Sequence, residues 1–163
     1  MLQTWKSRAV QGRRGEDGFT LVELMVVVLI IAVLLAIAIP TFLGSQGKSK
    51  DRAAQSALRN TITSAKTVFV DTANYTNVTD TALRAAEPSL SFLATGTAST
   101  GPKEVSVNPA SSTTFYAAAK SASGSCFYIK DDSAATVTYA TGPNTDTCSG
   151  TRAAGKTFSA TGW

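Results

Sequence analysis

A continuous apolar run near the N-terminus constrains this chain of 163 residues more than any other feature. From Leu21 to Ile39 there are nineteen residues, fourteen of which are Leu, Ile or Val, and Glu23 is the single charge. A helix of this length crosses the hydrocarbon core of a bilayer. Each aliphatic residue favours insertion by roughly 0.3 to 0.6 kcal/mol, so together they outweigh the roughly 3 kcal/mol that one acid costs at mid-helix. The sequence therefore predicts a membrane helix.

Basic residues before this run predict its orientation. Lys6, Arg8, Arg13 and Arg14 all precede it, and positive charges beside a span stay in the cytoplasm. We expect a cytoplasmic N-terminus, with the last 120 or so residues outside.

Two simpler interpretations account for part of the pattern. A cleavable signal peptide fits Ala36-Ile37-Ala38, which has the small-x-small form of a cleavage site. The apolar region of such a peptide, however, is usually about seven to fifteen residues long and uncharged. A plain single-span anchor explains the apolar run but leaves Gly18-Phe19 and Glu23 without a role.

The order of residues 13–40, RRGEDGFTLVELMVVVLIIAVLLAIAIP, resembles the N-terminus of type IV pilins and their pseudopilin relatives. In that family a prepilin peptidase cuts the class III signal sequence on the cytoplasmic side and methylates the new N-terminus. By this resemblance Gly18 ends a leader over residues 1–18, Phe19 is the methylated first residue of the mature chain, and Glu23 is its fifth. The similarity extends to about residue 65.

The acid within the apolar run needs a partner. A lone carboxylate in hydrocarbon is costly, and cleavage before Phe19 creates an α-amino group, of the same chain or of a stacked neighbour, that can pair with Glu23. Leaving one of the two charges unpaired in an apolar core costs several kcal/mol. We therefore expect Glu23 to set the register of assembly. The alternative is a glutamate near the membrane surface that water solvates.

Pro40 is expected to kink or locally open the helix, because it lacks an N–H and clashes with the carbonyl four residues back, near Ala36. Gly44 and Gly47 weaken the same stretch. The resemblance implies a zone that loses helical order on assembly and lets a fibre stretch. The simpler interpretation is the end of a membrane span.

Beyond the glycines the apolar residues become periodic, which indicates an amphipathic helix to about Tyr75. The residues that recur at steps of three or four are Ala54, Leu58, Ile62 or Ala65, and Phe69. We expect an apolar helix over residues 19–47 that spans the membrane or packs in a filament core. An extracytoplasmic head over residues 48–163 follows, and the amphipathic helix is its first element.

The rest of the head is rich in Ser, Thr, Ala and Gly. Asp80 is expected to cap a short helix through Glu87, which Pro88 ends. Alternating residues separated by turn residues predict strands over 103–107, 114–120, 125–130 and 135–139. We expect an α+β fold like that of type IV pilins. In it the long helix packs on a small antiparallel sheet of three or four strands, because so small a head needs the helix as a packing partner.

Two cysteines, Cys126 and Cys148, fall in the exported part. Outside the cytoplasm a pair of thiols in one small domain forms a disulfide, here closing a loop of about 23 residues and contributing roughly 3 kcal/mol. A metal or redox pair is the alternative, but the chain has no histidine and the spacing matches no metal motif. The resemblance implies a C-terminal surface loop closed by this bridge, holding Asp131, Asp132, Gly142, Pro143, Asn144 and Asp146.

No enzymatic pattern is visible in the sequence. It offers neither a nucleophile beside a base nor paired carboxylates in a recognisable motif, and its glycines form no phosphate loop. We expect no enzyme activity, no metal and no cofactor. Lys48, Lys50, Arg52 and Arg59 lie just past the span, within reach of lipid headgroups or of a neighbouring subunit's acids. No interleaved aromatic residues indicate a nucleic-acid site.

The resemblance implies a structural subunit of a type IV pilus, cleaved and N-methylated by prepilin peptidase and polymerised through its N-terminal helix into a homo-oligomeric filament. Its implied partners are that peptidase, an assembly platform with its ATPase, and the inner membrane before assembly. The filament would then lie on the cell surface and serve adhesion, motility or DNA uptake. Two alternatives stay open: a pseudopilin of a type II secretion or competence system, and a single-span surface protein that never polymerises.

Overall fold

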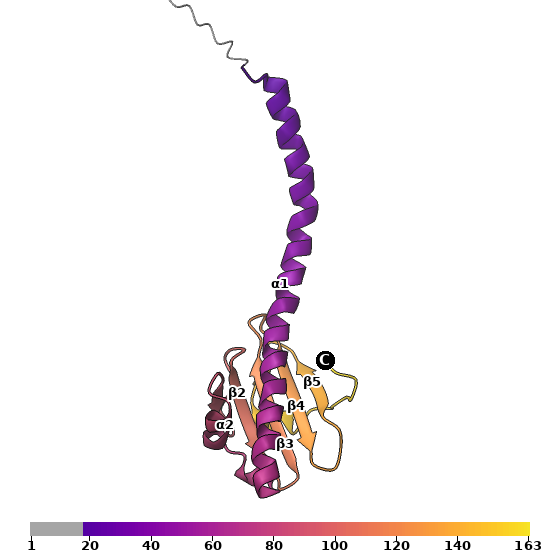
Figure 1. The fold of residues 1–163 in the computed structure, drawn as a ribbon. Helices are drawn as coiled ribbons and strands as arrows, with labels where there is room; N and C mark the ends of the chain where they lie inside the picture. The colour runs from indigo at the N-terminus through magenta and orange to yellow at the C-terminus, as the bar shows by residue number, and fades with distance from the viewer. Residues whose placement is uncertain (1–17) are drawn as a thin grey trace, which may run out of the picture. The chain divides into compact units, whose positions relative to one another are not determined.

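The computed structural model describes residues 18–163 of the chain. Residues 1–17 of the expected leader, with Lys6, Arg8, Arg13 and Arg14, lie outside the described residues. The chain divides into two compact units, Met1–Pro40 and Thr41–Trp163. Figure 1 labels the main helices and strands and colours them by residue number.

One long helix, α1, covers Leu21–Thr72 and contributes to both units. It continues through Pro40, Gly44 and Gly47, so the helix persists where its residues have the lowest helix propensity. A kink at Pro40 stays a prediction.

Helix α1 ends three residues before Tyr75, its predicted end. Ala73 adopts a left-handed conformation with φ of 50°, and its N–H closes the last turn on the carbonyl of Phe69 at 2.6 Å. The side chain of Asn74 then caps a single 3-10 turn, η1 (Tyr75–Asn77), by accepting from the N–H of Thr76. A left-handed residue and a new cap therefore stop the helix.

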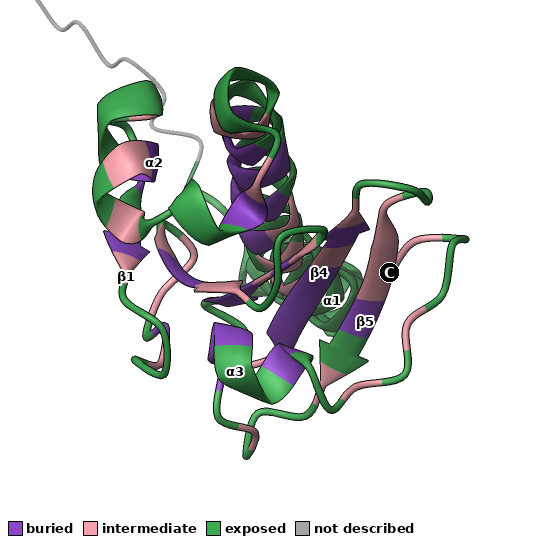
Figure 2. Cartoon of the chain, turned by 90° about the horizontal axis from the view of Figure 1, so that it is seen from below, coloured by how far each residue is buried: buried purple, intermediate pink, exposed green. Residues whose placement is uncertain are grey.

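In the unit Thr41–Trp163, one face of α1 packs on a β-sheet and is buried (Figure 2). The predicted apolar positions Ala54, Leu58, Ile62 and Ala65 are all buried, and Phe69 is partly buried. Ala57, Thr61 and Ser64 complete the buried face. The hydroxyl groups of Thr61 and Ser64 donate to helix carbonyls four residues back, at 2.8 and 3.1 Å. The helix therefore satisfies its own buried polar atoms, as such atoms require.

The sheet has five strands in the order β1-β2-β3-β4-β5. They are β1 (Ser91–Leu93), β2 (Glu104–Pro109), β3 (Thr114–Lys120), β4 (Cys126–Asp132) and β5 (Thr138–Gly142). The four predicted strands overlap β2 to β5, which pair antiparallel. The last one was predicted three residues too early, because 135–139 shares only Thr138 and Tyr139 with β5. Strand β1, which the sequence did not predict, adds to the edge in parallel with β2. The long helix on a mainly antiparallel sheet confirms the predicted α+β fold.

Two short helices complete this unit. Helix α2 spans Asp80–Ala86, and its N-cap is Thr79, whose hydroxyl accepts from the N–H of Ala82 at 3.2 Å. The prediction that Asp80 is the cap was wrong by one residue. Helix α3 (Gly150–Ala153) was not predicted. It begins at Gly150, where a Cβ atom would lie 2.7 Å from the backbone of Val107, so glycine is required for this close approach.

Both faces of the sheet are covered. The face toward α1 carries Val105, Phe115, Phe127 and Ile129 within the main core. The other face carries Ala118 and Tyr128, which pack with Cys126, Cys148 and Ala153 in a second buried cluster. Helix α3 lies over this second face (Figure 2).

The outer edge of β5 is partly covered by the C-terminal segment. Tyr139 forms an antiparallel bridge with Ser159, with two backbone hydrogen bonds of 2.8 and 2.9 Å. The indole N–H of Trp163 donates to the carbonyls of Tyr128 and Ala140 at 3.1 and 3.0 Å. The segment is therefore held to the sheet by backbone and side-chain bonds.

Candidate processing and assembly site

The expected cleavage junction lies just before α1. Gly18, Phe19 and Thr20 precede the helix and are exposed, with Phe19 80% exposed. A Cβ atom at Gly18 would meet nothing within 4 Å, so packing within the chain does not explain a glycine there. An exposed, non-helical junction is a form that a peptidase can bind.

Thr20 and Glu23 form a reciprocal cap at the start of α1. The hydroxyl of Thr20 accepts from the N–H of Glu23 at 3.1 Å. The carboxylate of Glu23 accepts from the N–H and from the hydroxyl of Thr20, both at 3.1 Å. This is a capping box, which satisfies two backbone donors that the helix leaves free. The negative charge also lies at the favourable end of the helix dipole.

Thr20 is a site residue that the sequence interpretation missed. Its signal was present, because Thr-x-x-Glu directly before an apolar run is the sequence form of a capping box. Glu23 therefore has hydrogen-bond partners before any amino group is created by cleavage. The carboxylate already has two donors in its own chain, although neither of them neutralises its charge.

The helix that follows exposes its aliphatic side chains on all sides. Those from Leu21 to Leu43 are between 49% and 74% exposed. Among residues 18–163, α1 is the one helix that is long and apolar enough to cross a membrane. A signal sequence can meet the same criteria of length and composition. So large an apolar surface is stable only against lipid or against other apolar helices.

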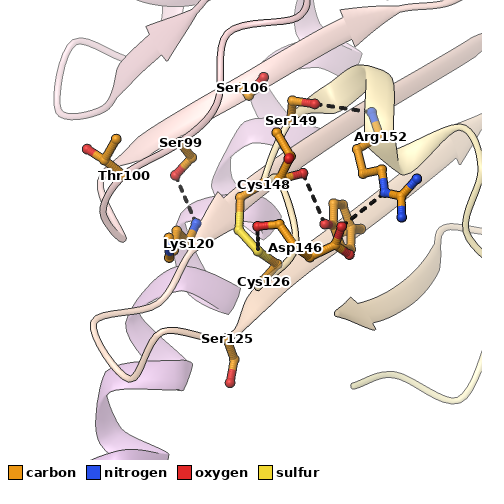
Figure 3. Close-up of a disulfide and its surroundings, with 12 residues drawn as sticks. Ser99, Thr100, Ser106, Lys120, Ser125, Cys126, Asp146, Cys148, Ser149 and Arg152 are labelled. Carbon is orange, nitrogen blue, oxygen red and sulfur yellow. Dashed lines mark hydrogen bonds and ion pairs between the residues drawn. A yellow bond between two sulfur atoms is a disulfide. The ribbon is translucent and has the colours of Figure 1, made fainter. Parts of the chain in front are cut away.

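At the other end of the chain, a disulfide joins Cys126 of β4 to Cys148, with the two Cα atoms 5.5 Å apart (Figure 3). The predicted bridge is therefore present. The segment that it closes is not a surface loop, because it is mostly the hairpin of β4 and β5. Asp131, which the prediction placed on that loop, is 1% exposed.

Asp146, two residues before Cys148, is the centre of an ion-pair cluster (Figure 3). Its side chain is 5% exposed, and its carboxylate accepts from the Nε of Arg152 at 3.0 Å and pairs with Lys156. Burial alone raises the pKa of this carboxyl group, but hydrogen bonds with Lys156, Arg152 and Tyr128 lower it to about 2. A Cβ at Gly142 would lie 2.4 Å from Asp146 Oδ2, so the glycine makes room for the cluster.

A second buried carboxylate joins the helical part of the head to the sheet. The hydroxyl of Tyr75 donates to Asp131 Oδ2. The Nζ of Lys66 lies 3.4 Å from Asp131 Oδ1, which has no hydrogen-bond partner among the described residues. Burial, together with Asp131, raises the pKa of Tyr75. The contact fixes the end of α1 against β4.

The described residues show no arrangement that indicates catalysis. Within residues 18–163, no group of three or more His, Cys, Asp or Glu side chains could hold a metal ion. The two buried carboxylates, Asp131 and Asp146, are each paired with a lysine. They connect elements of the fold.

Comparison with known proteins relates the N-terminal part of the chain to a known motif. Residues 13–39 match the model of the prokaryotic N-terminal methylation motif. The chain is 45% identical over 60 residues to the type IV major pilin protein PilA of Myxococcus xanthus, covering 37% of this chain and 27% of the relative. It is 33% identical over 64 residues to the type IV wide pilus major component PilA4 of Thermus thermophilus. This match covers 39% of this chain and 49% of the relative. The matched part spans about half or less of each relative's length.

No solved structure matches this chain significantly. The architecture of a long N-terminal helix, a mainly antiparallel sheet and a disulfide nevertheless fits the α+β fold of pilin-like proteins. Together with the methylation motif and the two relatives, it supports a type IV pilin.

Proposed function

We propose that this protein is a structural, non-enzymatic subunit of a type IV pilus. The observation that carries the proposal is the methylation motif over residues 13–39, joined to a helix whose large aliphatic side chains from Leu21 to Leu43 are exposed. Both curated relatives are named as major pilus components, which favours a pilus over the secretion-system alternative.

In the proposed sequence of events, a prepilin peptidase cuts between Gly18 and Phe19 and methylates the amino group of Phe19. The leader of residues 1–18 is discarded, and the apolar helix over residues 19–47 holds the subunit in the inner membrane with the head outside. An assembly platform and ATPase then move it into a surface filament. Pro40 provides a point at which the helix can bend or open.

Glu23 has a proposed second role in assembly beyond the capping box. When subunits stack with an axial offset, the carboxylate pairs with the α-amino group of Phe19 in a neighbour. Because two charges leave the apolar core together, only the register that pairs them is stable. The contact joins two different surfaces of one chain and does not close, so it generates an open helical polymer.

Mass spectrometry of the mature protein tests the proposal. We expect an N-terminal peptide that begins at Phe19 and is heavier by one methyl group. We also expect an antibody against the head to label long surface filaments along their whole shaft in electron microscopy. A different first residue would contradict the proposed processing. Properly processed protein without external filaments would instead favour the pseudopilin or the single-span protein.

A further inference from the structure

We infer that the heads of neighbouring subunits dock sideways, with a basic stripe on α1 of one copy against an acidic flank beside α2 of the next. This contact rests on the proposed function and adds a second, charged interface to the apolar one. Both surfaces belong to the unit Thr41–Trp163.

The basic stripe consists of Lys48, Arg52, Arg59 and Lys66. Steps of four and seven residues separate them, and at 3.6 residues per turn such steps keep side chains on one side of a helix. All four residues are exposed. Two of them show which way the stripe faces, because Arg59 lies 5.1 Å from the ring centroid of Trp163 and Lys66 pairs with Asp131 of β4. The stripe therefore borders the side of the head formed by β4, β5 and the C-terminal segment.

The acidic flank consists of Asp71, Asp80, Glu87 and Glu104. Asp80 begins α2 and Glu87 is its C-cap, while Glu104 pairs with Ser91 of β1. Asp71 lies three helical turns beyond Asn60, which lines a groove of about 300 Å³ with residues that precede β1 and β2. Of the cations on this side, Arg84 pairs with Asp80 at 3.9 Å and Lys103 makes no ion pair among the described residues. The flank keeps an excess of negative charge.

The two surfaces face different sides of the same head: α2 and β5 flank α1 on its two sides (Figure 1), the stripe borders the side of β5, and the flank lies beside α2. One copy therefore presents both surfaces at once, and each can meet its complement on another copy. Complementary charges of this kind fix register and exclude wrong arrangements more than they add affinity. Contact between two different surfaces propagates without closing.

Lipid headgroups are the other partner that basic residues next to a span can bind. From Lys48 to Lys66 the stripe extends about 27 Å along the helix at 1.5 Å per residue. The headgroup region of one leaflet is only about 5 to 8 Å thick. A membrane could contact the first residue or two, whereas a second copy can contact the whole stripe.

Charge reversal in the full-length protein, in cells that assemble it, tests the docking. Lys48→Glu/Arg52→Glu reverses the stripe, and Asp71→Lys/Glu87→Lys reverses the flank. None of these four residues makes an ion pair among residues 18–163. The matched control, Lys50→Glu/Lys120→Glu, makes the same net-charge change as the stripe variant at positions outside both surfaces. Lys50 lies two residues from Lys48 and from Arg52, and so on another side of α1.

We expect the stripe variant and the flank variant each to lower the yield of sheared filaments about tenfold or more, the effect of roughly 1.4 kcal/mol. The control should stay within about twofold of the wild type, and the combined variant should recover most of the yield, because opposite charges face each other again.

Equal loss of filament yield in the control and stripe variants, or no recovery in the combined variant, would overturn the docking. If the stripe variant were lost from the membrane fraction and the flank variant kept the filament yield of the wild type, lipid would be the partner of the stripe instead. A wild type that forms no filaments would refute the pilus proposal itself, before any variant is compared.

Discussion

At the scale of single residues, Glu23 combines two physical roles that its replacement by alanine cannot separate. Its carboxylate accepts from the N–H of Thr20 and completes the helix cap. Its charge is the one acid within the apolar run. Replacement by alanine removes both the cap and the charge.

Comparing Glu23→Gln with Glu23→Ala separates the two roles. Glutamine is the other residue that completes a capping box, so Glu23→Gln keeps the cap and removes the charge. Since the proposed register depends on pairing with an amino group, we expect both variants to be processed at Phe19 but to be depleted from sheared filaments. Immunoblots of membrane and sheared fractions measure this. Normal filament yield from Glu23→Gln would mean that capping is sufficient and that the charge pair is not needed.

Asp146 is expected to make the stability of the head dependent on pH. Hydrogen bonds with its partners hold its folded-state pKa at about 2, below the ordinary 3.8. A carboxyl group with a lowered pKa stabilises the fold fully above its unfolded pKa, and that contribution is lost as the pH falls from about 3.8 to about 2. Asp146→Asn should therefore lower the free energy of unfolding near pH 6 by at most about 2 kcal/mol. Near pH 2 the difference should shrink toward zero.

Urea unfolding of the full chain in detergent, followed at several pH values, checks this. Asp71→Asn is the matched control, because Asp71 is exposed and makes no ion pair among the described residues. Its unfolding midpoint should follow the wild type throughout. If the deficit of Asp146→Asn were the same at pH 2 as at pH 6, lost packing would explain it and the ionisation argument would fail.

At the scale of elements, the disulfide fixes the hairpin of β4 and β5 to the segment that carries α3. Cys126 and Cys148 are both buried, and the bridge closes a loop of about 23 residues. The double variant Cys126→Ser/Cys148→Ser should lose roughly 3 kcal/mol of unfolding free energy. Urea denaturation measures it, and wild-type protein unfolded with a reductant present should match the variant. Unchanged midpoints in both would show that the ion pairs of Asp146 alone hold this segment.

The elements also show where sequence reasoning succeeds and where it stops. Strand β3 was predicted with its observed bounds, because the strand-forming residues Thr114, Phe115 and Tyr116 begin it and turn residues flank it. Strand β1 has three residues and pairs in parallel with a strand that follows a long connection. A segment this short has no period to detect, and its pairing depends on tertiary packing. Helix α3, with four residues, was missed for the same reason.

The burial of charged side chains was also not predictable from the sequence. The predicted surface loop placed Asp131 and Asp146 in solvent, whereas both are buried against lysines. For Asp131 the hydroxyl donor, Tyr75, lies 56 positions away in the chain. No local pattern reports such a contact. The N-terminal site was easier to predict, because its parts follow one another within six residues, from Gly18 to Glu23.

At the scale of the whole molecule, the two units differ in what stabilises them. In residues 18–40 no side chain is buried, while the unit Thr41–Trp163 holds both buried clusters. The head can therefore fold with its own core, and the apolar helix depends on its surroundings, lipid or other copies. Substitutions in the head should mainly change the stability of the fold, and substitutions in the apolar helix should mainly change assembly.

The bridge between Tyr139 and Ser159 has a consequence for the proposed fibres where two of them lie side by side. An uncovered strand edge invites a strand of another molecule to continue the sheet. Here the C-terminal segment already occupies part of the outer edge of β5. At this edge, bundles of the proposed fibres would then adhere through side chains and not through a shared backbone ladder. Salt should loosen them, as it does any association between charged surfaces, and they should separate without unfolding their subunits.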